Sequence, residues 1–186
     1  MLSGKVIWHT MMSLDGFIAG PSDDMGWVFG VDGGDGETAV EVRQSVGALL
    51  VGRRTQDVED RVQGGFYGGA FAGPFFVLLH DPPAEPPVVK GVSGRFLDVG
   101  IEEAVSVARA AAGGRNVVVL GANVARQCVE AGLLDEIIVH VAPVLVGGGV
   151  RLYERAGPPV KLESASSRQE GETTVLRYSV RHAEVC

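Results

Sequence analysis

The segment from Leu49 to Thr55 has the residue types of an anion-binding site. An apolar run, Leu-Leu-Val, ends at Gly52 and is followed directly by Arg53, Arg54 and Thr55. Glycine lets a ligand approach the backbone, a helical turn starting near Thr55 would direct free N–H groups outward, and each guanidinium can bind two phosphate oxygens. The segment therefore predicts a phosphate site, and the alternative is a basic turn that is only solvated.

A second candidate anion site follows the apolar run at residues 116–120. Gly121 turns the chain directly into an expected helix, and Asn123 has the side chain of a helix N-cap. In sheets that are covered by helices, ligands collect at the carboxyl ends of the strands, where a helix N-terminus carries partial positive charge. Two such sites would suit the pyrophosphate of a dinucleotide, although many strand–helix junctions carry a glycine without binding a ligand.

The usual dinucleotide fingerprint, GxGxxG between a strand and a helix, is absent from the sequence, so we do not expect a conventional Rossmann site. The Leu49–Thr55 segment is not a Walker loop either, because that loop requires GxxxxGK followed by Ser or Thr. No acidic residue is suitably spaced to bind a ribose 2′-hydroxyl, whereas Arg53 and Arg54 could bind a 2′-phosphate. These residues favour NADP(H) over NAD(H).

The segment after the first strand, residues 13–35, could cover a flat ring. It combines glycines with apolar and aromatic side chains, among them Phe17 and Trp27. A loop of this kind can exclude water from a bound ligand. The alternative is a tight turn in which Asp15 caps backbone N–H groups while Phe17 and Trp27 fill the core.

The elements that would position these residues follow from the apolar periodicity. Short β-rich runs alternate with helical stretches, which is typical of α/β proteins. We expect strands at residues 6–12, 48–51, 75–79, 116–120 and 136–141, and helices at 37–46, 101–112 and 123–131. Two further strands, at 160–167 and 173–181, flank a polar segment with one glycine and should form an antiparallel hairpin. Residues 13–35, 61–74 and 80–94 are expected to be irregular.

Composition and charge exclude several classes of protein. The 186 residues, 46% of them hydrophobic, are enough for one domain over residues 1–186 with its own core. A formal net charge of −7 would repel nucleic acid and anionic membranes. The longest apolar run, 137–146, is about half of the ~20 residues that a membrane-spanning helix needs, and no signal-peptide cleavage site follows the first ten residues. We therefore expect a cytoplasmic protein; its two cysteines, Cys128 and Cys186, form no metal-ligand pattern, and no metal site is expected.

The sequence resembles the dihydrofolate-reductase-like superfamily, and within it the stand-alone relatives of the reductase domain of the bifunctional deaminase-reductases of riboflavin biosynthesis. Five segments carry the resemblance, in the same order and spacing: SLDGFIAG (13–20), VGRRT (51–55), LGANVARQ (120–127), AGLLDE (131–136) and APVLVGGG (142–149). The resemblance implies a three-layer α/β fold whose mixed, mostly parallel sheet has helices on both faces and a C-terminal antiparallel hairpin. It also implies NADPH binding, hydride transfer to a small heterocyclic substrate that is pterin- or pyrimidine-like, and a homodimer.

The resemblance also assigns residues to the cofactor and the substrate by position. The adenosine-side phosphates would be bound by Gly52, Arg53, Arg54 and Thr55. His80 would lie near the 2′-phosphate, and the alternative is an exposed loop histidine. The pyrophosphate would be bound by Leu120, Gly121, Ala122, Asn123, Val124 and Ala125. The nicotinamide would be approached by Ile18, Ala19 and Trp27, and the substrate by Asp15 and Met25.

The proton donor departs from the pattern of typical dihydrofolate reductases. Their proton-donating carboxylate lies early in the helix before the GRxT-type strand, where this chain offers Glu37 and, less closely, Glu41. A glutamate in an apolar pocket keeps its proton to higher pH and can supply it when a C=N bond is reduced, so Glu37 is the candidate catalytic residue. The alternative is an exposed first-turn glutamate that the helix dipole favours. Val119 and Leu120 stand where riboflavin-type reductases often carry an acidic residue, so the resemblance does not identify the substrate.

These observations favour an NADPH-dependent oxidoreductase. One alternative is a non-catalytic NADP(H)-binding sensor that kept the cofactor site and lost its acid. Another is a phosphotransferase or hydrolase, which would need metal-binding carboxylates beside the phosphate; the nearest ones, Asp57, Glu59 and Asp60, are expected on the solvated face of a short helix. The redox assignment requires that the Arg53–Arg54 pair and the Gly121 turn share one cleft.

Overall fold

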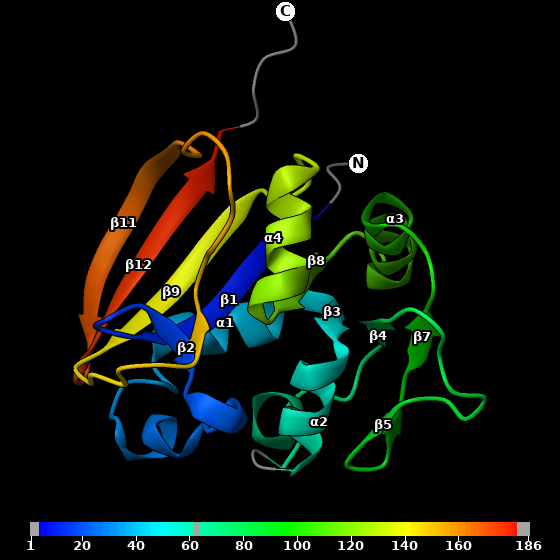
Figure 1. Ribbon diagram of the computed structural model, residues 1–186, viewed down its shortest axis with the longest axis horizontal. Coiled ribbons are helices and arrows are strands. Elements are labelled where there is room, and N and C mark those ends of the chain that lie inside the picture. The colour runs from blue at the N-terminus through cyan, green and yellow to red at the C-terminus, as the bar shows by residue number, and fades with distance from the viewer. Residues whose placement is uncertain (1–3, 62–63, 182–186) are drawn as a thin grey trace, which may run out of the picture.

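An eight-stranded sheet forms the centre of the molecule (Figure 1). The computed structural model describes residues 4–61 and 64–181. The strand order is β11-β12-β9-β1-β8-β3-β4-β7. The bounds of these strands along the chain are β1 Val6–Ser13, β3 Val46–Gly52, β4 Phe75–Leu78, β7 Arg95–Leu97, β8 Asn116–Leu120, β9 Glu136–Ala142, β11 Leu162–Glu170 and β12 Thr173–Val180. The strands from β9 to β7 are parallel to one another, whereas β12 and β11 are antiparallel to their neighbours.

Helices and two small ribbons complete the described chain. The α-helices are α1 Glu37–Ser45, α2 Arg53–Arg61, α3 Ile101–Ala112 and α4 Ala122–Glu130. Three short 3-10 helices are η1 Pro21–Asp23, η2 Gly26–Gly30 and η3 Phe66–Gly69. The ribbons are β2 Phe17–Ala19 with β10 Val150–Arg151, and β5 Val88–Val89 with β6 Val92–Ser93.

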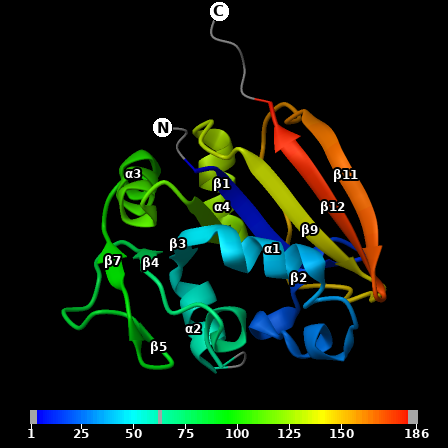
Figure 2. The same ribbon diagram turned by 180° about the vertical axis from the view of Figure 1, so that it is seen from behind.

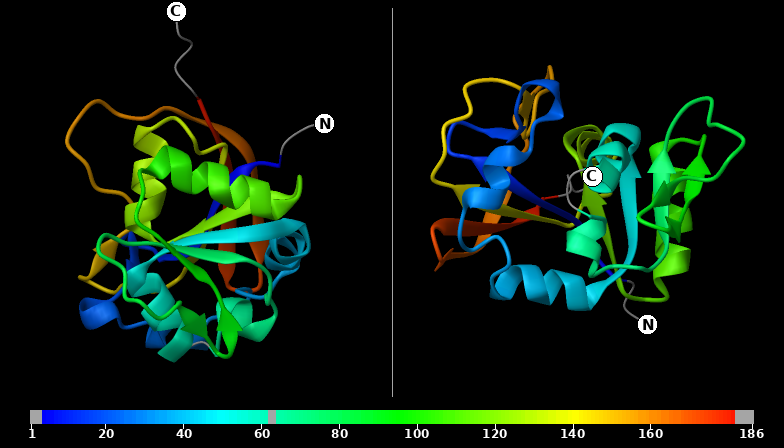
Figure 3. Two further views of the ribbon diagram at one scale, coloured as in Figure 1. Left: turned by 90° about the vertical axis from the view of Figure 1, so that its right-hand side faces the viewer. Right: turned by 90° about the horizontal axis from the view of Figure 1, so that it is seen from below.

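Both faces of the parallel part of the sheet are buried, which explains its nearly continuous apolar strands. On β8, Val117 and Val119 pack into the cluster formed with α3 and α4, while Val118 packs into the cluster on the α1 side. Figure 1 shows the face that α4 covers, Figure 2 shows α1 on the opposite face, and Figure 3 shows the layers from two further directions. The sequence prediction of a mixed sheet with helices on both faces and a C-terminal hairpin is confirmed.

The structure differs from the sequence prediction in the segments expected to be irregular. Residues 13–35 contain β2, η1 and η2, residues 61–74 contain η3, and the edge strand β7 was not expected. The short helix expected near Thr55 is α2, which begins two residues earlier, at Arg53. Asn123 is not an N-cap, because α4 begins at Ala122 with Gly121 as its N-cap, and the Asn123 side chain instead accepts a hydrogen bond from Arg126 at 3.1 Å.

Two further findings concern the cysteines and the question of membrane-spanning helices. Cys128 is buried in α4, where burial raises the pKa of its thiol to about 12, and Cys186 lies outside the described residues. Within residues 4–61 and 64–181, no helix has the length and apolar character needed to cross a membrane.

A carboxylate from the C-terminal hairpin caps the N-terminus of α1. The N-cap residue, Gly36, has no side chain to bond the free N–H groups. Glu170, at the end of β11, fills this role: it is buried and accepts hydrogen bonds from the Thr38 backbone N–H at 3.1 Å and from the Thr38 hydroxyl at 2.7 Å. A Cβ at Gly36 would overlap the Glu170 carboxylate, so a side chain there would displace the cap. The hairpin thus fixes the first turn of α1.

Replacing Glu170 with alanine is expected to lower the free energy of unfolding by about 1–3 kcal/mol, because it leaves buried donors of Thr38 unsatisfied. Urea denaturation of the variant beside the wild type measures this loss. Glu172→Ala is the matched control, since Glu172 is exposed on the same hairpin. Equal effects of the two substitutions would contradict the capping role.

Candidate functional site

The two predicted anion sites lie side by side at one edge of the sheet. β3 and β8 are adjacent and parallel, with Val51 opposite Leu120, so Gly52 and Gly121 follow at the same carboxyl edge. α2 starts directly after Gly52, and α4 starts directly after Gly121 (Figure 1). Two helix N-termini, each with free N–H groups and partial positive charge, therefore meet at this edge.

Close packing between Thr55 and Gly121 joins the two sites. Gly121 has φ +89°, and a Cβ added to it would overlap the Thr55 hydroxyl oxygen. A Cβ at Gly52 would lie 3.5 Å from a methyl group of Val124, at the start of α4. The residues that the sequence assigned to the two ends of one ligand are thus neighbours at one edge of the sheet.

Both arginines are exposed, and each is bound to an aspartate. Arg53 pairs with Asp57 at 3.1 Å one turn along α2. Arg54, whose side chain is 71% exposed, binds Asp23 with two hydrogen bonds, of 3.1 Å from Nε and 2.5 Å from a terminal nitrogen. Asp23 belongs to η1, so this ion pair links the loop of residues 13–35 to α2. The guanidinium groups lie at the carboxyl edge, accessible to an anion that competes with the aspartates.

His80 lies two residues beyond Leu78, the last residue of β4, which is opposite Gly52 in the sheet. Its side chain is 95% exposed, and Nδ1 lies 3.1 Å from a carboxylate oxygen of Asp98. The structure thus places His80 at the same edge as the arginines, in the exposed loop position that the alternative interpretation describes.

The Asp15 carboxylate binds its own loop and the segment before β10. It accepts hydrogen bonds from the Ser13 hydroxyl at 2.6 Å and from the backbone N–H groups of Val146 and Gly147 at 3.0 and 2.7 Å. The Ser13 hydrogen bond, followed by the backbone donors, lowers the pKa of Asp15 to about 2. This arrangement is the N–H capping expected in the alternative to substrate binding.

The other residues assigned from the same loop differ in burial. Ile18 and Ala19 are buried in β2, beside the paired strand β10. Met25 and Trp27, around the start of η2, are half-buried. The indole N–H of Trp27 is buried and has no hydrogen-bond partner among the described residues. A buried donor without a partner is rare in folded proteins and is where a ligand could supply an acceptor.

Glu37 lies in the position that the sequence analysis gave as the alternative to catalysis. Its side chain is 88% exposed and binds Arg168 of β11 at 2.9 Å. Glu41 binds Arg177 with hydrogen bonds of 3.0 and 2.9 Å, and these bonds lower its pKa. Neither carboxylate has the apolar pocket that would hold a proton at neutral pH.

The carboxyl group with such an environment is Glu59, which we expected on a solvated helix face. That expectation is wrong: Glu59 is 9% exposed, and burial raises the pKa of its carboxyl to about 8. It lies one turn after Thr55 on α2, so the two side chains are neighbours on the helix surface. The acidic neighbours misled the sequence analysis, because Asp57 and Asp60 are indeed exposed.

The three carboxylates of α2 do not converge on a metal site. Asp57 binds Arg53, Asp60 accepts the Lys90 backbone N–H at 2.8 Å, and Glu59 is buried. No group of three or more His, Cys, Asp or Glu within the described ranges is arranged to hold a metal ion.

Sequence reasoning also missed a polar chain in the interior, formed by Tyr67, His9 and His140. Tyr67 of η3 lies 2.9 Å from Nδ1 of His9, on β1, and Nε2 of His9 lies 2.9 Å from Nε2 of His140, on β9. Burial, followed by His140, lowers the pKa of His9 to about 3, and burial also lowers the pKa of His140. Both imidazoles are therefore neutral at pH 7. The available signal was a histidine in each of two apolar strands that pair in the sheet.

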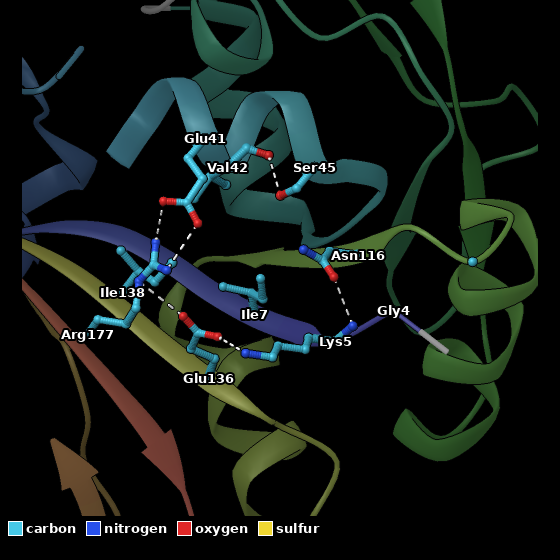
Figure 4. A pocket seen from close by; sticks show the side chains of 11 residues that line it. Gly4, Lys5, Ile7, Glu41, Val42, Ser45, Asn116, Glu136, Ile138 and Arg177 are labelled. Carbon is cyan, nitrogen blue, oxygen red and sulfur yellow. Dashed lines mark hydrogen bonds and ion pairs between the residues drawn. The ribbon is translucent and has the colours of Figure 1, made fainter. Parts of the chain in front are cut away.

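A cavity of about 350 Å³ opens at the opposite, amino edge of the sheet (Figure 4). Its charged side chains bind one another. Glu136 contacts Lys5 at 2.6 Å and Arg177 at 3.2 Å, and Arg177 also binds Glu41. Because these four charged side chains are paired with one another, we interpret them as a structural ion network. We therefore place the candidate site at the carboxyl edge and not in this cavity.

The sheet order and its two helical layers define an α/β domain with the dihydrofolate-reductase-like fold. The profile of the RibD C-terminal domain family matches residues 4–66 and 76–176. The chain belongs to this family. The fold and family that the sequence motifs predicted are therefore confirmed.

Solved structures share the fold at low sequence identity. A putative riboflavin biosynthesis protein from Shewanella sp. PV-4 has a TM-score of 0.81 and 21% identity over 96% of this chain and 99% of that one. The diaminohydroxyphosphoribosylaminopyrimidine deaminase/5-amino-6-(5-phosphoribosylamino)uracil reductase of Thermotoga maritima has a TM-score of 0.71 and 17% identity; the match covers 96% of this chain and 57% of that chain. A pyrimidine reductase-like protein from Corynebacterium diphtheriae has a TM-score of 0.64 and 12% identity, with 97% and 93% coverage. No curated protein matches the sequence.

Replacing Gly121 with alanine is expected to lower the free energy of unfolding by about 1–2 kcal/mol, because the positive φ and the overlap with Thr55 both oppose a Cβ. Gly100→Ala is the matched control: Gly100 also precedes a helix, but its φ is −67° and a Cβ there would meet its nearest atom at 3.5 Å. Urea denaturation compares the two variants. An undiminished stability of the Gly121 variant would show that the turn tolerates a side chain.

Glu59→Gln is expected to be more stable than the wild type at pH 8–9 and to lose this advantage at pH 5. The folded pKa of about 8 exceeds the ordinary value of 4.5, so the folded state binds the extra proton and wild-type stability falls as pH rises from about 4.5 to about 8. The expected difference is on the order of a few kcal/mol. Urea denaturation at intervals from pH 5 to 9 measures it, and a pH-independent difference would refute the buried neutral carboxyl.

Proposed function

We propose that the protein is an NADPH-dependent reductase that transfers hydride to a small heterocyclic substrate of the pyrimidine or pterin type. The observation that carries this proposal is the meeting of two helix N-termini with Arg53, Arg54 and Thr55 at one carboxyl edge of the sheet. Backbone N–H groups, a hydroxyl and two guanidiniums are the donors that a phosphorylated dinucleotide requires.

The residues present fit NADPH. Because Gly121 has no Cβ, a pyrophosphate beside the Thr55 hydroxyl could reach the backbone N–H of Gly121 and the N–H groups of the first turn of α4. Arg53 and Arg54 would bind the 2′-phosphate, with the exposed His80 near it. When bound, NADPH supplies the hydride. The chain's part is to orient the cofactor, exclude water from the nicotinamide with the 13–35 loop, and deliver a proton.

The comparisons support a heterocyclic substrate. The Thermotoga relative is named as a 5-amino-6-(5-phosphoribosylamino)uracil reductase, and the Corynebacterium relative as pyrimidine reductase-like. We therefore place pyrimidines first among the substrates to test, with pterins second. The expected homodimer and the cytoplasmic location stay predictions.

One observation favours the second candidate, a non-catalytic NADP(H)-binding sensor: Glu37 is exposed and paired with Arg168. A protein that kept its cofactor site and lost its acid would bind NADPH but would not oxidise it in the presence of any heterocycle. A screen of pyrimidines, pterins and flavins for NADPH oxidation separates the two functions.

Replacing Arg53 and Arg54 together with alanine is expected to weaken NADPH binding at least ten-fold and to leave NADH binding within about two-fold, because only NADPH carries the 2′-phosphate. Isothermal titration with each nucleotide measures both affinities. Arg155→Ala is the control, since Arg155 is half-buried in the segment between β10 and β11 and bonds only its own loop among described residues. An equal loss for both nucleotides would show that the pair does not distinguish them.

A further inference from the structure

An aspartate of the chain itself occupies one guanidinium of the proposed phosphate site. Asp23, in η1, accepts two hydrogen bonds from Arg54, of 3.1 Å from Nε and 2.5 Å from a terminal nitrogen. This is also the two-point geometry in which an arginine binds a phosphate. The same edge of the guanidinium cannot bind both groups at once, so the Asp23 carboxylate and a phosphate compete for Arg54.

The Arg54 pair differs from the Arg53 pair in what it connects. Asp57 lies four positions after Arg53 on α2, so that ion pair stays within one helix. Asp23 and Arg54 are 31 positions apart, and their ion pair joins η1, in the blue segment between β2 and α1, to α2 (Figure 1). A phosphate that replaces Asp23 on Arg54 therefore also removes a contact that holds η1.

The backbone of η1 has an unfavourable conformation. Ser22 and Asp23 have φ +57° and +61°, in the left-handed region that residues other than glycine rarely adopt. Such conformations persist where surrounding contacts hold them. The bond between the Asp23 carboxylate and Arg54 is one of these contacts, so its loss allows η1 to leave this conformation.

Hydrogen bonds connect η1 to the start of η2. The Asp24 carbonyl accepts the Gly20 N–H at 2.8 Å, and the Asp24 carboxylate accepts the Gly26 N–H at 2.9 Å. Trp27 follows directly, and its buried indole N–H has no partner among the described residues. Residues 20–27 are therefore one hydrogen-bonded segment that ends at an unused buried donor.

We propose that Asp23 is a built-in competitor for the cofactor phosphate, and that residues 20–27 are released when the 2′-phosphate of NADPH replaces Asp23 on Arg54. The proposal rests on the reductase function proposed above and concerns the regulation of the same site. NADH lacks that phosphate, so it leaves the Asp23–Arg54 pair in place. The loop that would cover the nicotinamide thus responds to the nucleotide that carries the phosphate.

The exposure of the ion pair sets the size of the effect. Arg54 is exposed and Asp23 is half-buried, and ion pairs of this kind contribute little to stability. The pair is therefore open in a fraction of the molecules that is on the order of one in three to one in five. The apparent NADPH affinity is reduced by this fraction, because only the molecules with a free Arg54 bind the phosphate there.

Asp23→Asn is expected to increase NADPH affinity about three- to five-fold and to leave NADH affinity within about 1.5-fold, because a neutral amide competes poorly for Arg54. Asparagine tolerates the left-handed backbone as aspartate does, so this variant changes the charge and not the turn. Isothermal titration with each nucleotide measures both affinities. An unchanged or lower NADPH affinity would overturn the proposal.

A double-mutant cycle separates competition for Arg54 from a general gain in positive charge. In an Arg54→Ala background, Asp23→Asn should change the NADPH affinity by less than about 1.5-fold, because competition requires the guanidinium. A gain of equal size in both backgrounds would show that Asp23 only repels the phosphate, and it would refute the competition.

Release of the segment can be measured without a substrate. The chain has two tryptophans, Trp8 in β1 and Trp27 in η2, so labelling with 5-fluorotryptophan gives one ¹⁹F resonance from the core and one from the segment. Adenosine 2′-monophosphate should shift the Trp27 resonance and leave the Trp8 resonance in place. Adenosine 5′-monophosphate, which has no 2′-phosphate, should shift neither.

The ligand-free variants give the matched comparison. Asp23→Asn alone should move the Trp27 resonance most of the way to its position with adenosine 2′-monophosphate, because the ion pair is already lost. Asp57→Asn removes the same charge from Arg53, whose pair lies within α2, and should leave the Trp27 resonance unchanged. Equal shifts in the two variants would show that the resonance reports charge and not release of the segment.

The outcomes distinguish this proposal from the reductase function. Tighter NADPH binding by Asp23→Asn, without NADPH oxidation in the presence of any heterocycle, refutes the reductase and leaves the competition standing. Equal NADPH affinity of the wild type and Asp23→Asn, with turnover, refutes the competition and leaves the reductase. A Trp27 resonance that does not respond to adenosine 2′-monophosphate refutes the release, and no NADPH binding by either protein refutes both proposals.

Discussion

The contact between the Thr55 hydroxyl and the backbone of Gly121 is the constraint on which the candidate site depends. The parallel pairing of β3 and β8 brings the N-termini of α2 and α4 to one edge, and this contact packs the two helix starts against each other. A glycine with positive φ makes the close approach sterically possible. The site is therefore assembled by backbone geometry, and the arginines add charge to a position that the sheet and the two helices have already fixed.

A second general feature is that two ionisable side chains in the interior, Glu59 and His9, are uncharged. Glu59 is protonated and His9 is neutral at pH 7, each because burial disfavours its charged form. At the amino edge the opposite solution is used, since Lys5, Glu41, Glu136 and Arg177 are charged and paired (Figure 4). The paired network needs no ligand, whereas the buried Glu59 carboxyl has an oxygen without a hydrogen-bond partner among the described residues and so could bind one.

Local sequence signals predicted the parts of the fold that local interactions decide. The apolar strands, the C-terminal hairpin and the helix α3 were predicted because each has a signal within a few residues. Motif order was enough to identify the family. The burial of Glu59 was not predicted, because it depends on how α2 packs against β3, β4 and β5 rather than on the acidic stretch in which Glu59 lies. The Tyr67–His9–His140 chain joins residues 58 and 131 positions apart, for which spacing gives no signal.

The central position of β1 has a consequence for how the chain folds. β1 is synthesised well before both of its partners, β8 and β9, which come from residues 116–142. Its Val-Ile-Trp run therefore emerges from the ribosome long before any strand exists to pair with it. Pairings this distant in sequence are slow to form and leave apolar backbone available for aggregation in the meantime. Synthesis of this protein thus includes an interval in which protection by a chaperone is of most use.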